Sequence, residues 1–116
     1  MKDSIVCEKS KNFAIRIIKL YQFLTIDSPM KEFVMSKQIL KRGTSIGANI
    51  KEAVRGQTRP DFRAKMNIAL KEASETEYWL ELLYETNYIE EKLYKSLIQD
   101  DLEIIKILTS IVKNSA

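Results

Sequence analysis

The sequence lacks most of the residues from which catalytic and metal sites are usually built. It contains no histidine and a single cysteine, Cys7, in 116 residues. One thiol forms no internal disulfide, so nothing indicates an oxidising compartment. The absence of histidine excludes a Cys/His zinc site, Ser-His-Asp or Cys-His catalysis, and the di-iron sites of helical bundles, which require Glu-x-x-His motifs.

Helix breakers and long apolar runs are also scarce. The chain has three glycines and two prolines, and no apolar stretch approaches the roughly 20 residues needed to cross a bilayer. The charged N-terminal segment MKDSIVCEKSKNFAIR has no apolar signal core, so we predict a cytoplasmic protein with no membrane partner. With 45% hydrophobic and 30% charged residues, the composition is that of one folded domain spanning residues 1–116.

Apolar residues recur in alternating steps of three and four along four stretches, which is the spacing of one helix face. Pro29 and Pro60 suit the first turn of a helix, and Asn87 suits a helix end. These signals predict helices at residues 4–25, 29–56, 60–86 and 90–113. Joined by short links, they specify an all-α, antiparallel up-down-up-down four-helix bundle.

Charge is unevenly distributed along the chain, although the net charge is only +3. Residues 31–65 hold nine Lys/Arg and three Asp/Glu, whereas residues 66–91 hold one Lys and seven Glu. The two blocks either pair between neighbouring helices or subunits, or the basic block binds an anionic partner such as RNA. The candidate nucleic-acid-binding residues are Lys41, Arg42, Lys51, Arg55, Arg59 and Arg63.

Two glycines, Gly43 and Gly47, lie inside the second predicted helix. Each costs about 1 kcal/mol relative to alanine, so their presence requires a reason in the packing. Both lie on the inward side of the helix. We expect either a close approach of a neighbouring backbone or room for a bulky side chain, for which the candidates are Phe13, Trp79 and Tyr84.

Two helices carry small or apolar residues outside their main seams. The outward side of the second helix includes Thr44, Ser45 and Ala48. A monomeric bundle needs one apolar stripe per helix, so additional faces indicate either a subunit interface or a wider intramolecular stripe. In the third helix the additional apolar residues are Ile68, Trp79 and Leu82.

Asn49 and Glu52 form a possible polar pair on the second helix. Asparagine is a mediocre helix former, so we expect its amide to bond a neighbouring helix or a helix end. We expect Glu52 to pair with an arginine, and the candidates are Arg42, Arg55 and Arg59. One carboxylate and one amide do not form a reaction centre, and we predict no catalytic residue, no metal site, no cofactor and no small-molecule substrate.

Two segments, TSIGANIKEA and DFRAKMNIALKEASETEYWLELL, make the sequence resemble the four-helix-bundle family of the 23S ribosomal RNA intervening-sequence protein. The motif residues in the second helix are Ser45, Ile46, Ala48, Asn49, Ile50, Glu52 and Ala53. Those in the third are Phe62, Ala69, Leu70, Ser74, Glu75 and Glu77. The sequence departs from the family pattern at Gly47, where proline is common, and at Ala53, where glycine is common.

The resemblance implies an antiparallel four-helix bundle that assembles into a ring-like homopentamer. It also implies similarity in fold to the accessory protein of diversity-generating retroelements, which engages reverse transcriptase and nucleic acid. The family has no well-established catalytic activity, and its name reflects the genomic location of its genes. We therefore predict a non-enzymatic homo-oligomer that binds RNA or a nucleic-acid-associated protein, with a protein-interaction scaffold as the alternative.

Overall fold

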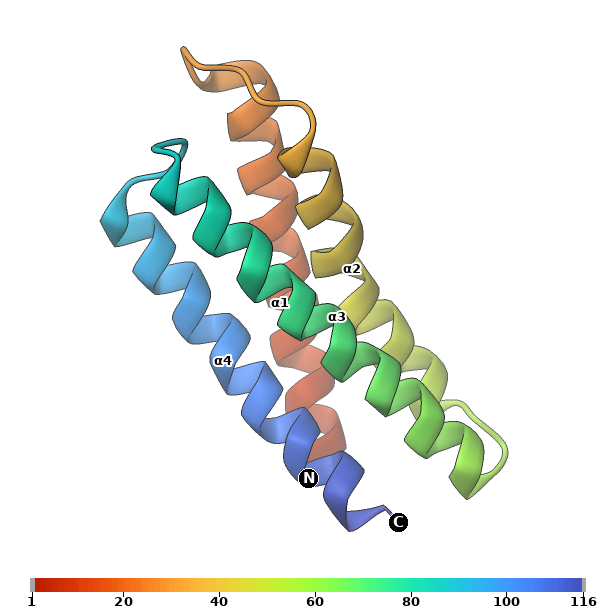
Figure 1. Ribbon diagram of the computed structural model, residues 1–116. Helices are drawn as coiled ribbons and strands as arrows, with labels where there is room; N and C mark the ends of the chain where they lie inside the picture. The colour runs from red at the N-terminus through yellow and green to blue at the C-terminus, as the bar shows by residue number, and fades with distance from the viewer. Residues whose placement is uncertain (1, 116) are drawn as a thin grey trace.

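In a computed structural model that describes residues 2–115, the chain forms four long helices and no β-strand. Helix α1 (Lys2–Gln22) continues through a π-helical turn, η1 (Phe23–Asp27), and is followed by α2 (Met35–Val54), α3 (Arg59–Glu85) and α4 (Glu91–Asn114). The α1–α2 and α3–α4 connections lie at one end of the bundle, and the α2–α3 turn lies at the other end with both chain ends (Figure 1). The predicted all-α, up-down-up-down bundle is confirmed.

Each helix buries one row of side chains toward the bundle axis. Helices α1 and α3 each pack against both α2 and α4, and the Cα atoms span 47 × 20 × 18 Å. The core rows follow the three-four spacing read from the sequence. The largest fully buried side chains come from all four helices: Phe13, Ile17, Leu24, Ile39, Ile46, Ile50, Met66, Leu80, Leu83, Leu97, Ile104 and Leu108.

Helix α2 begins at Met35, whereas the sequence indicated a start near Pro29. Pro29 lies instead in the loop of residues 28–34. In that loop the buried Glu32 carboxylate accepts the backbone N–H groups of Val34 and Met35, both at 3.0 Å. It also accepts the N–H of Ser36 at 2.7 Å. Because the first N–H groups of a helix have no partner within it, this carboxylate determines where α2 begins.

Replacing Glu32 with alanine is expected to lower the free energy of unfolding by about 2 kcal/mol, because three backbone donors lose their acceptor. Urea denaturation of the two proteins measures the change. Glu32→Gln keeps one acceptor oxygen at the same position, so its loss is expected to be smaller. Equal losses in the two variants would contradict the capping role of the carboxylate.

Gly43 and Gly47 allow α1 to lie close against α2. A Cβ atom on Gly43 would lie 2.8 Å from Cγ2 and 2.9 Å from Cγ1 of Ile17. A Cβ atom on Gly47 would lie 3.3 Å from Oγ and 3.6 Å from the carbonyl carbon of Ser10. The expected close approach of a neighbouring backbone is therefore present at Gly47, whereas Gly43 makes room for a side chain. The side chain accommodated at Gly43 is Ile17 and not one of the three aromatic candidates, because Ile17 lies opposite this glycine in the α1–α2 packing.

An acidic side chain, Asp101, interrupts the buried row of α4. It is fully buried, and neither carboxyl oxygen has a hydrogen-bond partner among the described residues. Burial, and then the nearby Glu77, raises the pKa of this carboxyl to about 8. The group is therefore mostly protonated at neutral pH. The preceding residue, Asp100, is partly exposed and accepts a hydrogen bond from Arg16 at 2.6 Å.

Candidate functional site

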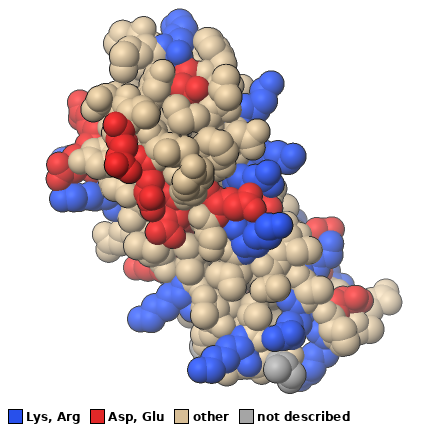
Figure 2. Space-filling model, viewed as in Figure 1, with Lys and Arg blue, Asp and Glu red and all other residues tan. Residues whose placement is uncertain are grey.

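Basic side chains occupy the first half of α3, whereas acidic side chains, apart from Asp61 in the first turn, lie from its middle to its end. Arg59, Arg63 and Lys65 lie near its start, whereas Glu81 and Glu85 lie near its end. Figure 2 shows a column of acidic side chains in the upper half of this face of the bundle, with several basic side chains below it. Basic side chains therefore lie near the positive end of the helix dipole and acidic side chains near its negative end. This arrangement is unfavourable within an isolated bundle. It makes the end that carries the α2–α3 turn electropositive.

Four of the six basic candidates lie around the α2–α3 turn, and all four are exposed. Lys51 and Arg55 line a hollow of about 820 Å³ beside the turn, together with two carboxylates, those of Glu52 and Asp61. Arg59 and Arg63 line a second hollow of about 500 Å³. None of the four has a carboxylate within ion-pair distance in the described part of the chain. We call these four residues the basic turn.

The other two candidates, Lys41 and Arg42, lie earlier on α2. The Arg42 guanidinium is engaged within the protein, with Nε 2.9 Å from Glu75 Oε2 and Nη1 3.4 Å from Glu72 Oε1. Both glutamates belong to α3, so these ion pairs join α2 to α3. Glu72 is also buried. Lys41 is exposed and lines neither hollow. The structure therefore separates both residues from the basic turn.

The family motif on α2 combines core residues with side chains that bond their own helix. Ile46 and Ile50 are fully buried. Ser45 Oγ donates to the carbonyl oxygen of Lys41 at 2.7 Å, and Asn49 Nδ2 donates to the carbonyl oxygen of Ser45 at 2.8 Å. The expectation that the Asn49 amide bonds another helix or a helix end is therefore wrong. A short amide side chain readily reaches the carbonyl one turn earlier.

The expectation that Glu52 pairs with an arginine is also wrong. The exposed Glu52 carboxylate lies 3.7 Å from Nζ of Lys65 on α3. The sequence did not indicate this pair, because it depends on which side of α3 faces the end of α2. Of the remaining motif residues, Ala48 is exposed, and Glu75 holds Arg42 as described above.

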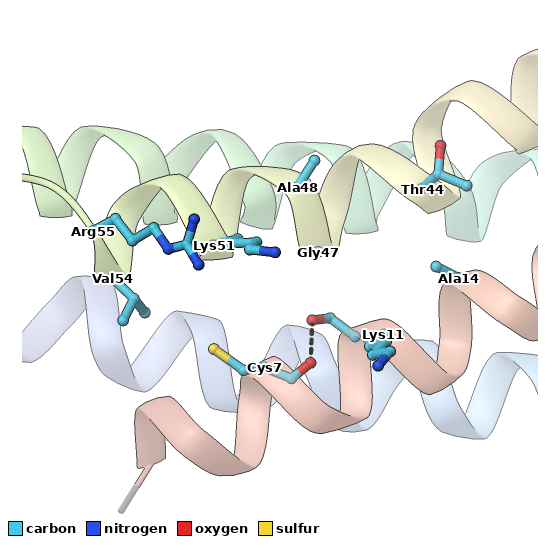
Figure 3. Close-up of a pocket in the computed structure, with 10 residues that line it drawn as sticks. Cys7, Lys11, Ala14, Thr44, Gly47, Ala48, Lys51, Val54 and Arg55 are labelled. Atoms are coloured by element: carbon cyan, nitrogen blue, oxygen red, sulfur yellow. Dashed lines mark hydrogen bonds between the residues drawn. The ribbon is translucent and has the colours of Figure 1, made fainter.

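A third hollow, the α1/α2 groove, was not predicted from the sequence. Figure 3 shows side chains of the two helices facing each other across it. Its volume is about 510 Å³. The sequence indicated no candidate binding residue on α1, because the face of α1 that lies beside α2 depends on how the two helices pack. The lining residues are Cys7, Ser10, Lys11, Ala14, Thr44, Gly47, Ala48, Lys51, Val54 and Arg55.

The hydroxyl groups of the groove are hydrogen-bonded within their own helices. Ser10 Oγ donates to the carbonyl oxygen of Cys7 at 3.1 Å (Figure 3). Thr44 Oγ1 donates to the carbonyl oxygen of Leu40 at 2.7 Å. Burial, and then the charge of Asp3, raises the pKa of the Cys7 thiol. The thiol is therefore protonated at neutral pH and a weak nucleophile.

Among residues 2–115, no three His, Cys, Asp or Glu side chains are grouped so that they could hold a metal ion. No helix in the same range is long and apolar enough to cross a bilayer.

The geometry defines an antiparallel four-helix bundle with a basic turn at one end. The 23S rRNA-intervening sequence protein family matches residues 2–110. The chain therefore belongs to this family, which confirms the resemblance seen in the second and third helices. A crystal structure of a protein of unknown function from the S23 ribosomal protein family of Bacteroides thetaiotaomicron VPI-5482 is 60% identical, with a TM-score of 0.94 over 97% of this chain and 99% of that chain. No curated protein sequence matches significantly.

Proposed function

We propose that the protein is a non-enzymatic homo-oligomer that binds RNA, alone or within a ribonucleoprotein, through the basic turn. The observation that carries the proposal is the set of four exposed cations around one helix connection, without a carboxylate partner in the described part of the chain. Arginine suits phosphate because its planar guanidinium forms two parallel hydrogen bonds. A bound polyanion would also offset the unfavourable charge order of α3.

The homo-oligomeric part of the proposal rests on the outer face of α3, where Ile68 and Tyr78 are 41% and 56% exposed. Trp79 and Leu82 are partly buried, and Trp79 packs against the core, so part of the additional apolar face is intramolecular. In a closed ring, such as the pentamer that the family resemblance implies, each subunit repeats the basic turn. Weak phosphate contacts then add through avidity.

Native mass spectrometry of protein purified without nuclease treatment tests both parts of the proposal. The expected result is a mass near an integer multiple of 13.5 kDa with RNA bound. A monomer would contradict the oligomer. An oligomer that carries no RNA and binds none when it is added would contradict the RNA-binding part.

Replacing Arg55, Arg59 and Arg63 with glutamine is expected to weaken binding to a ribosomal RNA hairpin. The slope of log affinity against log salt concentration should also become shallower, by about one for each phosphate group that the variant no longer neutralises. Fluorescence anisotropy over a potassium chloride series measures both changes. The matched control makes the same charge change at three exposed lysines away from the turn, namely Lys19, Lys37 and Lys92. Equal RNA binding by the two triple variants would show that the basic turn is not the site.

The alternative function is a protein-interaction scaffold in which the basic turn of one subunit meets the acidic half of α3 in the next. The opposite charges of the two halves of α3 support this alternative. A salt titration separates the two functions, because exposed ion pairs weaken as salt rises. The scaffold is expected to lose subunits at high salt, whereas the RNA binder is expected to lose only RNA.

A further inference from the structure

We propose that the α1/α2 groove docks an acidic amphipathic helix of a partner protein. The charge on its rim supports this occupant. Lys11 stands on the α1 side, and Lys51 and Arg55 stand on the α2 side (Figure 3). No acidic residue occurs among the described residues that line the groove. Anionic side chains along both edges of a bound helix would therefore meet cations on both sides.

The floor of the groove is shaped for close helix packing. Ser10 and Ala14 on α1, and Gly47 and Ala48 on α2, are all small. A third helix in the groove can therefore pack close to both backbones, because the side chains at a contact determine how closely helices approach. The lining residues of α2 extend over positions 44–55, which at about 1.5 Å per residue corresponds to roughly three helical turns.

The polar groups of the floor favour an apolar protein surface over nucleic acid. Because the hydroxyls of Ser10 and Thr44 already donate to carbonyl oxygens, an apolar surface can cover them without leaving an unsatisfied donor. Val54, 47% exposed, adds an apolar contact. Single-stranded nucleic acids commonly bind by stacking bases on aromatic side chains. No aromatic residue occurs among the described residues that line the groove.

This docking does not rest on RNA binding by the basic turn, although the two sites share two cations. Lys51 and Arg55 line both the groove and the hollow at the turn. Lys11 and Ala14 lie on α1 and line the groove but not the two hollows of the basic turn. Variants at these two positions therefore test the groove while the basic turn remains intact.

The probe is a displayed library of helical peptides with varied surface residues, selected against the full chain. We expect the enriched peptides to carry apolar residues at i, i+3, i+4 and i+7, flanked by Asp and Glu. The single thiol of the chain lies in the groove, so a bound peptide is expected to slow alkylation of Cys7 by iodoacetamide. Enrichment of no acidic amphipathic sequence, or unchanged alkylation with peptide bound, would overturn the proposal.

Two groove variants and one matched control locate the binding. Lys11→Glu is expected to weaken peptide binding about tenfold, because an attraction at the rim becomes a repulsion. Ala14→Gln fills the floor without changing charge and is expected to weaken binding similarly. Lys19→Glu makes the same charge change on α1 at an exposed position outside the groove lining and is expected to leave binding unchanged. Circular dichroism verifies that all three variants fold.

RNA binding provides the second readout for the groove variants. Loss of peptide binding with RNA binding retained supports the proposal. A selected peptide that binds both groove variants as tightly as the unaltered protein overturns it. Loss of RNA binding in both groove variants, with no peptide selected, also overturns it and assigns the groove to nucleic acid.

Discussion

Asp101→Asn is expected to raise the free energy of unfolding by about 4 to 6 kcal/mol at pH 8, and by much less near pH 4. The fully buried carboxyl has a pKa of about 8 in the folded protein, compared with an ordinary value of 3.8. Asparagine has nearly the same shape and does not ionise. The variant therefore removes the ionisation of the side chain at this position and preserves the packing of α4.

The direction follows from which state releases the proton first. As pH rises above about 4, the unfolded chain ionises Asp101 while the folded protein keeps it protonated, so folding becomes less favourable. The loss amounts to about 1.4 kcal/mol per pH unit and ends near pH 8, where the folded state also ionises. Urea denaturation at several pH values between these limits is expected to show a steep decline in the unaltered protein and a flatter profile in the variant.

The surroundings of Asp101 indicate a suitable control. Glu77 on α3 adds to the upward pKa shift. On α1, Arg16 is engaged with Asp100 and with the Ser96 side chain, and Lys9 pairs with Glu103. Asp100→Asn alters the adjacent carboxylate, whose side chain is 42% exposed, and is expected to change stability by less than about 1 kcal/mol. Identical pH profiles for Asp101→Asn and the unaltered protein would contradict the assignment.

Gly43→Ala is expected to destabilise the bundle by about 1 to 3 kcal/mol, because a methyl group has no room between α1 and α2. The new Cβ atom would lie 2.8 Å from Ile17 Cγ2, and Ile17 is fully buried and branched at Cβ. This clash outweighs the roughly 1 kcal/mol by which alanine normally favours a helix over glycine. Thermal and urea denaturation measure the difference.

Two further variants determine whether the clash with Ile17 is the cause. Gly47→Ala places its Cβ no closer than 3.3 Å to Ser10 Oγ, so the expected change is within about 1 kcal/mol. Ile17→Ala alone creates a cavity and is expected to cost about 2 to 5 kcal/mol. If the clash is real, the Gly43→Ala/Ile17→Ala double variant loses less stability than the sum of the single variants. An additive result would show that Ile17 is not the obstacle.

The sequence by itself determined the class of fold and the family. The three-four spacing of apolar residues is a local property of each helix, and the short links leave few ways for four such helices to pack. The second-helix motif, which includes Ile46 and Ile50, was sufficient to suggest the family that residues 2–110 match. The end of α3 was also readable, because Asn87 suits a helix end, and in the structure it follows α3 in the left-handed conformation with φ of 68°.

Only the tertiary structure decided where α2 begins and which charged groups are available to a partner. Glu32 sets the start of α2 through contacts made by a loop whose course is not periodic. Arg42 and Arg55 are indistinguishable in sequence, yet Arg42 is held by two glutamates of α3 and Arg55 faces a hollow. The α1/α2 groove likewise depends on how closely the helices approach at Gly47. Periodicity specifies which face of a helix is buried, whereas ion pairs and grooves depend on the register and distance between helices.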